Sequence, residues 1–372
     1  MIWNMFFQNM KKFRNKAVRR GTALAVCCFV LTSFCGCARR EDGRDSLKNE
    51  TEERLSVVTT IFPQYDFVRQ IAGDKVELKM LLKPGEETHS YEPTPQDIIA
   101  IQKSDLFIYV GGENDAWVED ILESSEMQNV HTLRLVDQVD TLEEESVEGM
   151  KPERGEHEHS EEEHDEDENE YEDGHDEEDH EDEDPGNGHS HTTDEHVWTS
   201  PLNAVRIVEG LTGELCVLDE KNESVYQENS EAYIDELYTL DAAFREVTAQ
   251  AKEEGHDTLL FGDRFPFRYF TEEYGLSYYA AFPGCASDTE PSAATMAFLI
   301  NKMRDERYPL VLKMELSSGA VAEAVAEACG ADVKVFYSCH NLTAEQFERG
   351  ETYLSMMWQN VETLKEALEV WH

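Results

Sequence analysis

The stretch from Glu153 to His196 combines the two side-chain types that bind divalent metal ions. Glu and Asp fill most of its positions, and imidazoles are scattered among them at His157, His159, His164, His175, His180, His189 and His191. Such an acidic segment has too little apolar surface to fold alone, and a merely solvated spacer needs no histidine. Because neutral imidazole is the commonest metal ligand, the composition predicts weak, multidentate capture of divalent metal, with a solvated spacer as the alternative.

The charge balance excludes nucleic acid as a partner. The formal net charge is -48 over 372 residues, and the acidic stretch supplies roughly half of it. A protein that binds DNA or RNA needs a basic surface that releases counterions. No cluster of Lys and Arg interleaved with aromatic residues occurs after the N-terminal segment.

The N-terminus has the pattern of an export signal. Basic residues at 11–20 precede an apolar run at 22–34 that is too short to span a bilayer, which is typical of a secretory signal over 1–37. The run ends in Phe-Cys-Gly-Cys, and a small residue before a cysteine resembles a bacterial lipobox. We therefore expect lipidation of Cys37, preceded by Gly36, and anchoring at the outer face of the cell membrane. An ordinary cleaved signal with incidental cysteines is the alternative.

Strands and helices alternate on both sides of the acidic stretch. After a charged tether at 38–54, we expect strands at 55–61, 76–82 and 106–110, with helices at 65–72, 95–103, 117–123 and 201–218. A second series has strands at 258–261, 278–281, 310–314 and 333–337, with helices at 265–274, 294–305, 320–329 and 353–370. Alternation of this kind predicts an α/β fold.

The two series predict two similar α/β lobes, each with a central sheet. The lobes occupy 55–219 and 253–372, and the first contains a disordered acidic insertion at 153–195. Between them, no Pro or Gly interrupts the helical pattern at 220–252, so one long helix joins the lobes. Ligands of such folds bind in the cleft outside the strand ends, where loops of both lobes converge.

Four motifs carry a resemblance to a known family. They are the stretches Thr59–Tyr65, Pro84–Pro95, Leu106–Gly112 and His196–Ala204. The chain resembles, from about Leu55 to Leu368, the zinc- or manganese-binding lipoproteins of bacterial ABC importers, a metal-binding cluster of the periplasmic-binding-protein class. The resemblance implies two lobes joined by one long helix, with the metal site between them. It also implies an ABC importer permease as partner and, in the zinc-binding members, an acidic His-rich loop.

The same resemblance implies a set of ligands. His89 and His196 match its first two positions, although a single loop histidine is more often an ordinary surface residue. The third position falls on Arg264, which cannot bind a cation, and a one-residue shift would present Asp263 instead. The fourth position falls in the segment Ser-Cys-His-Asn, where His340 is the natural replacement.

Two cysteines of the exported body follow successive strands of the second lobe. Cys285 and Cys339 therefore form our expected disulfide, since an extracytoplasmic location permits one. The alternative is a thiolate ligand from Cys339, which would suit zinc.

The expected donors favour zinc. Imidazoles with one carboxylate suit Zn²⁺, whereas Mn²⁺ sites lean to oxygen donors, and copper and nickel also bind imidazole. We expect a monomeric protein without enzymatic activity that captures zinc outside the cytoplasm and delivers it to an importer. The alternatives are a manganese-binding or other divalent-metal protein of this class, a secreted zinc hydrolase, and a surface adhesin. No His-Glu-x-x-His helix or nucleophile elbow supports the hydrolase.

Overall fold

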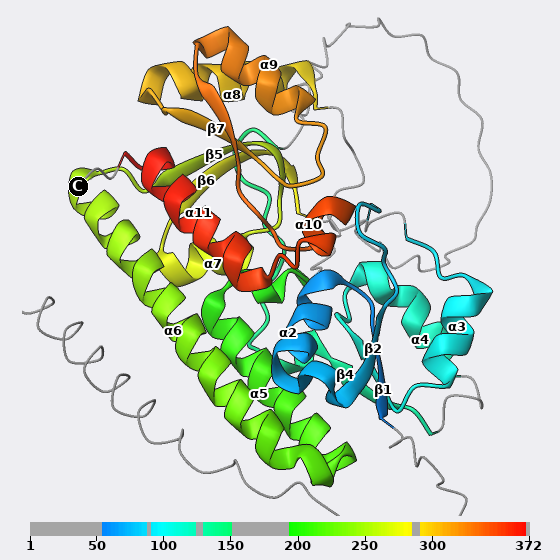
Figure 1. Cartoon of the computed structure of the whole chain (residues 1–372). Coiled ribbons are helices and arrows are strands. Elements are labelled where there is room, and N and C mark those ends of the chain that lie inside the picture. Colours follow the sequence, from blue (N-terminus) through cyan, green and yellow to red (C-terminus); the bar gives the residue numbers. More distant parts are fainter. Residues whose placement is uncertain (1–53, 88–90, 124–128, 151–192, 285–290, 370–372) are drawn as a thin grey trace, which may run out of the picture. The chain divides into compact units, whose positions relative to one another are not determined.

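The computed structural model describes residues 54–87, 91–123, 129–150, 193–284 and 291–369 (Figure 1). All of these belong to one compact unit, Glu52–His372. The predicted signal and tether, together with Cys37, His89, Cys285 and the seven histidines of the acidic stretch, lie outside the described residues.

The first lobe contains a four-stranded parallel sheet with strand order β2-β1-β3-β4. Its strands are β1 (Leu55–Thr59), β2 (Val76–Met80), β3 (Leu106–Tyr109) and β4 (His131–Arg134), and its helices are α2 (Phe62–Ala72), α3 (Pro95–Gln102) and α4 (Ala116–Leu122). The sequence did not predict β4. Only Leu133 of its four residues is buried, so the strand has no apolar run that would reveal it.

The second lobe repeats this arrangement with strand order β6-β5-β7-β8. Its strands are β5 (Thr258–Phe265), β6 (Ser277–Pro283), β7 (Leu310–Lys313) and β8 (Asp332–Val335), and its helices are α7 (Arg268–Tyr274), α8 (Ala293–Glu306), α9 (Ala320–Cys329), α10 (Ala344–Glu348) and α11 (Tyr353–Ala367). In both sheets the first strand lies between the second and the third. The prediction of two similar α/β lobes is confirmed, and the sheet of each lobe is parallel. Such folds bind ligands at the carboxyl ends of their central strands, which here are β1 and β3 in the first lobe and β5 and β7 in the second.

Two long helices pack side by side, and the second of them joins the lobes. The helix α5 (Pro201–Leu218) begins where Ser200 Oγ accepts the amide of Asn203, with Pro201 in its first turn. The helix α6 (Glu223–Glu254) has 32 residues, about 48 Å at 1.5 Å per residue. It packs against α2 of the first lobe and against α7 and α11 of the second, and Figure 1 shows it running beside α5 and α11.

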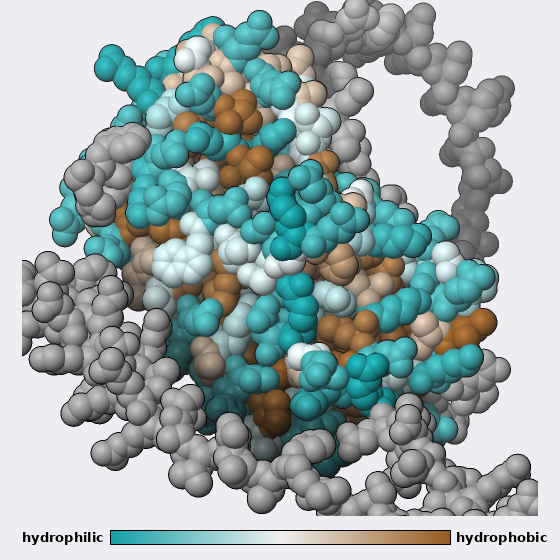
Figure 2. All heavy atoms as spheres, in the orientation of Figure 1, coloured by the Kyte–Doolittle hydropathy of each residue, from teal (hydrophilic) through white to brown (hydrophobic). Residues whose placement is uncertain are grey.

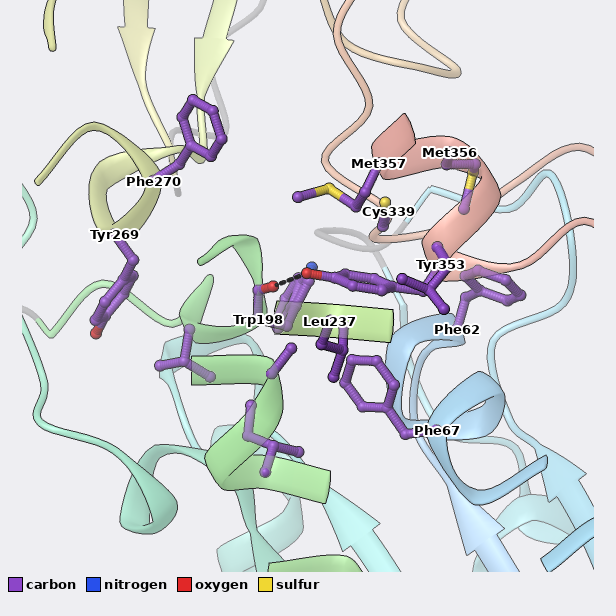
Figure 3. Packing of buried hydrophobic residues seen from close by; sticks show 14 of the residues in the cluster. Phe62, Phe67, Trp198, Leu237, Tyr269, Phe270, Cys339, Tyr353, Met356 and Met357 are labelled. Atoms are coloured by element: carbon purple, nitrogen blue, oxygen red, sulfur yellow. Dashed lines mark hydrogen bonds between the residues drawn. The ribbon is translucent and has the colours of Figure 1, made fainter. Parts of the chain in front are cut away.

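The lobes share a hydrophobic core in addition to the connecting helix. One buried cluster contains residues of both sheets and of α2, α5, α6 and α11. In Figure 3 the ring of Tyr353 lies among Phe62, Phe67 and Leu237, and its hydroxyl donates to the backbone oxygen of Trp198 at 2.8 Å. The helix α11 of the second lobe therefore packs on α2 of the first, which ties the two lobes together.

The folded body resumes before the expected end of the acidic insertion. Thr193 pairs with Glu143 in an antiparallel bridge, and Asp194 and Glu195 are buried. The prediction of a disordered loop over 153–195 is therefore wrong for its last three residues.

On the face shown in Figure 2, hydrophilic residues predominate and hydrophobic ones form separate patches. Across the part of the chain that the structure describes, no helix combines the length and the apolar character needed to cross a membrane.

Candidate metal centre

In the first lobe, a hydrogen bond to the imidazole ring of His196 fixes the orientation of this side chain. It precedes the short helix η5 (Val197–Thr199) and is fully buried. Its Nδ1 lies 3.0 Å from Asp194 Oδ1, and the same oxygen accepts the backbone amide of His196 at 2.8 Å. A carboxylate acceptor at Nδ1 makes this nitrogen the protonated one, so Nε2 of the neutral ring carries the lone pair that binds metals.

The residues that precede His196 are fixed by the loop after β3. The amide groups of Asn114 donate to the carboxylate of Glu195, and burial raises the pKa of that carboxyl above its usual value. A Cβ at Gly112 would lie 2.0 Å from Glu195 Oε2, so any other residue there would displace the Glu195 side chain. Asp115 accepts the amides of Val110 and Gly111, and its burial raises its pKa to about 6.

His340 is held through its backbone in the second lobe. It follows β8, is half-buried, and its amide donates to Glu315 Oε1 at 3.1 Å. The same carboxylate accepts the amide and the hydroxyl of Ser338, each at 2.7 Å, and burial raises the pKa of Glu315. Sequence reasoning missed Glu315. The signal was its place directly after a buried strand, at the carboxyl edge of the sheet.

The structure brings the two histidines together. The ring centroids of His196 and His340 are 5.4 Å apart, with the ring planes at 87°. The buried indole of Trp198 lies 5.6 Å from the first ring and 5.0 Å from the second, and its Nε1 donates to Ser338 O at 2.8 Å. A Cβ at Gly284, after β6, would lie 3.3 Å from His196 Cε1, so a glycine lets the second lobe approach this ring closely.

A small polar cavity of about 30 Å³ adjoins His340. It is lined by residues of both lobes, among them Glu86, Glu87, Arg264, Glu315, His340 and Asn341. The Asn341 amide donates to the backbone oxygens of Lys83 and Glu86, both at 2.9 Å, and Gly85 N donates to Leu342 O at 2.8 Å. The loop of the first lobe that leads to position 89 is therefore tied to the loop that carries His340.

Asp263 is not brought together with the two histidines. Its Oδ1 accepts the amide of Arg264 at 2.9 Å and its Oδ2 accepts the amide of Met314 at 3.2 Å. The second bond joins β5 to the end of β7, and the two bonds together give the carboxylate a structural role. Among the described residues, no three His, Cys, Asp or Glu side chains form a group that could hold a metal ion.

Cys339 is a core residue. Its backbone has φ +60°, its side chain is fully buried, and Figure 3 shows it beside Met357 and Tyr353. The structure has Cys339 as a free thiol, and its expected disulfide partner Cys285 lies outside the described residues, so that pairing stays a prediction. Burial raises the pKa of the thiol, which disfavours the thiolate that a metal would need.

Comparison with known proteins gives a consistent set of relatives. The family model described as zinc-uptake complex component A, periplasmic, matches residues 57–367. The high-affinity zinc uptake system protein ZnuA of Bacillus subtilis is 31% identical over 350 residues, which are 94% of this chain and 98% of that protein. The zinc-binding lipoprotein AdcA of Streptococcus pneumoniae is 29% identical over 346 residues. That match covers 93% of this chain, but the chain spans only 60% of the length of AdcA.

Solved structures share the fold. The Zn(II)-bound ZnuA-like domain of Streptococcus pneumoniae AdcA is 26% identical with a TM-score of 0.64, and the match covers 85% of this chain and 100% of that one. The metal-dependent lipoprotein YcdH of Bacillus subtilis is 28% identical with a TM-score of 0.65, at the same coverage. Since the family model matches most of the chain and a relative of nearly equal length is 31% identical, the chain belongs to the periplasmic zinc-uptake component A family.

Proposed function

We propose that this protein binds one zinc ion between its lobes, outside the cytoplasm, and delivers it to the permease of an ABC importer. The observation that carries the proposal is the pair of imidazoles, His196 and His340, which two different lobes bring within 5.4 Å of each other. A site whose donors come from loops of two lobes suits capture and release, since ligand sites of such folds lie in the cleft where the lobes meet. The family to which the chain belongs supports the same cargo.

The proposed donors are His89, His196 and His340. Glu87, the last described residue before the gap, forms an ion pair with Arg264 of the other lobe at 3.0 Å. Position 89 is two residues further along, within about 7 Å of extended chain. Three imidazoles form a donor set that favours zinc over manganese and leaves one position for water or a further ligand. Glu315 supports the set by holding the backbone of His340.

The rest of the proposal concerns the location and the acidic stretch. Cys37 is the proposed lipid anchor at the extracytoplasmic face of the cell membrane, and the AdcA relative, a zinc-binding lipoprotein, supports this location. The monomer binds and releases zinc without chemical turnover. The histidines of the acidic stretch act as weak accessory sites. Cys37→Ala should abolish labelling by a radioactive fatty acid, and equal labelling of this variant would move the anchor elsewhere.

The function is tested by metal analysis of protein purified without added metal. We expect one tightly held zinc per chain, resistant to dialysis, and displacement only by a strong chelator. Manganese at the same concentration should not displace it. Protein that binds no zinc tightly, or that exchanges zinc for manganese at equal concentration, would refute the proposal. Conversion of a model ester or peptide by the zinc-loaded protein would favour the hydrolase instead.

A further inference from the structure

Arg264 places a permanent positive charge in the wall of the polar cavity. The cavity is lined by three carboxylates, Glu86, Glu87 and Glu315, and by His340, and Arg264 is the only Lys or Arg among its described lining residues. Its guanidinium is largely buried, with 11% of the side chain exposed, and its Nη2 lies 3.0 Å from Glu87 Oε1. Arginine stays protonated at every physiological pH.

A local irregularity of β5 places this side chain. The register between β5 and β6 shifts between Phe261 and Arg264. Bulges of this kind are frequent beside functional sites, where they redirect a side chain. The two backbone bonds accepted by Asp263 stabilise the bulged segment and join it to the end of β7. The backbone of the second lobe thus fixes where the side chain of Arg264 begins, and the ion pair with Glu87 holds its guanidinium.

The charge acts on a divalent cation in two ways. It repels a dication directly, and it engages Glu87, a carboxylate that would otherwise attract the dication. The direct repulsion is weakly screened, because the guanidinium is largely shielded from water, whereas 48% of the Glu87 side chain is exposed. The other basic neighbour of these carboxylates, Lys83, pairs with Glu86 but has 76% of its side chain exposed. Its charge is therefore largely screened.

We propose that Arg264 is a tethered cation that competes with the bound metal ion. It lowers the affinity of the cleft below the value that the donors alone would give, and it speeds release of the ion. This inference rests on the proposed function, because it assumes that a divalent cation occupies the cleft beside His340. The guanidinium and the ion compete for Glu87 in one cavity, so a weaker bond of Glu87 to Arg264 strengthens its attraction for the ion.

The test compares substitutions that remove or keep the charge. Arg264→Met and Arg264→Gln should each bind zinc at least tenfold more tightly than the wild type, about 1.4 kcal/mol, and release it more slowly. Arg264→Lys should stay within about threefold of the wild type, since it keeps the charge. Affinity is measured by competition with a zinc chelator, release by stopped-flow transfer to excess chelator, and folding by thermal melting of each variant.

Arg268 offers a matched control for net charge. Its side chain is 21% exposed and pairs with Glu145 and Glu272, and it does not line the cavity. Arg268→Met should leave zinc affinity within about twofold, because a charge engaged elsewhere on the lobe acts weakly at the site. Glu87→Gln should weaken binding, and the double variant with Arg264→Met should return close to the wild type.

The outcomes separate this inference from the proposed function. If neutral substitution of Arg264 leaves affinity unchanged or weakens it, the competing-cation role is refuted, even though zinc still binds at the cleft. If the wild type binds no zinc, or if His340→Ala leaves its affinity unchanged, the proposed function fails first. If Arg268→Met raises zinc affinity as much as Arg264→Met does, the effect arises from the net charge of the protein, and the inference is also overturned.

Discussion

The two lobes have the same strand order but hold their histidines differently. In the first lobe, the ring of His196 is fully buried and its Nδ1 is bonded to Asp194. In the second lobe, the half-buried His340 is fixed through its backbone amide, which donates to Glu315. The ring orientation and the tautomer of His196 are therefore set before metal binds, whereas His340 is placed only by the conformation of its loop. A preorganised ligand loses less freedom on binding, so the first lobe should contribute more to zinc affinity.

The largest expected effect is loss of the preorganised ring. His196→Ala should weaken zinc binding by at least 100-fold, about 3 kcal/mol, because it removes a donor that needs no further ordering. His340→Ala should weaken binding by a smaller factor, of about tenfold or more. Competition with a zinc chelator measures both, with thermal melting to confirm folding. An equal or reversed order of the two losses would break the comparison between the lobes.

The next effect concerns the group that orients each donor. Asp194→Ala should weaken zinc binding by about 10- to 100-fold, since it removes the acceptor at Nδ1 of His196. Asp194→Asn keeps an acceptor oxygen and should recover most of the loss. Glu315→Ala frees only the backbone of the His340 loop and should cost less than tenfold. A larger loss from Glu315→Ala than from Asp194→Ala would show that loop placement matters more than ring orientation.

The last prediction concerns folding stability and the buried carboxyl of Asp115, which follows β3. Burial raises the pKa of Asp115 to about 6, above its ordinary value of 3.8, so folding favours the protonated form. The resulting stabilisation is complete below the ordinary pKa and is lost as the pH rises through 6. Relative to the wild type, Asp115→Asn should therefore gain about 1 to 3 kcal/mol in the free energy of unfolding between pH 4 and pH 8.

Urea unfolding at several pH values measures this gain. Asn keeps one oxygen for the two backbone amides that Asp115 accepts, so the local structure is preserved. A stability difference that does not change with pH would mean that Asp115 titrates as an exposed carboxyl does. The segment after β3 would then admit water around Asp115 and Glu195, although both side chains are buried in the structure.

The sequence predicted elements whose pattern is local. The helix α5 occupies its predicted residues because a serine cap and a proline mark its start. The long helix was expected at 220–252 and runs over 223–254, since no Pro or Gly interrupts it. The short edge strand β4 escaped prediction because a single buried residue cannot establish a periodicity.

The site was predictable only in part, because its remaining features depend on pairing between distant segments. His196 and His340 were expected to meet, and they do. Whether Asp263 or Arg264 faces the site depends on a register shift in β5. Pairing with the neighbouring strands decides this shift, so the sequence of β5 alone does not reveal it. In the sequence, Glu315 resembles any other acidic residue after a strand. Only the structure shows the three hydrogen bonds that it accepts from Ser338 and His340 in the loop after β8.

The central claim is that tight zinc binding resides between the lobes and not in the acidic stretch. The most direct measurement is a calorimetric zinc titration of four proteins: the wild type, a variant lacking residues 153–191, the double variant His196→Ala/His340→Ala, and the combination of the two. The deletion should remove the weak sites and leave one tight site. The double variant should lose the tight site and keep the weak ones, and the combination should lose both. Disappearance of the tight site with the acidic stretch, or its persistence in the double variant, would contradict the account.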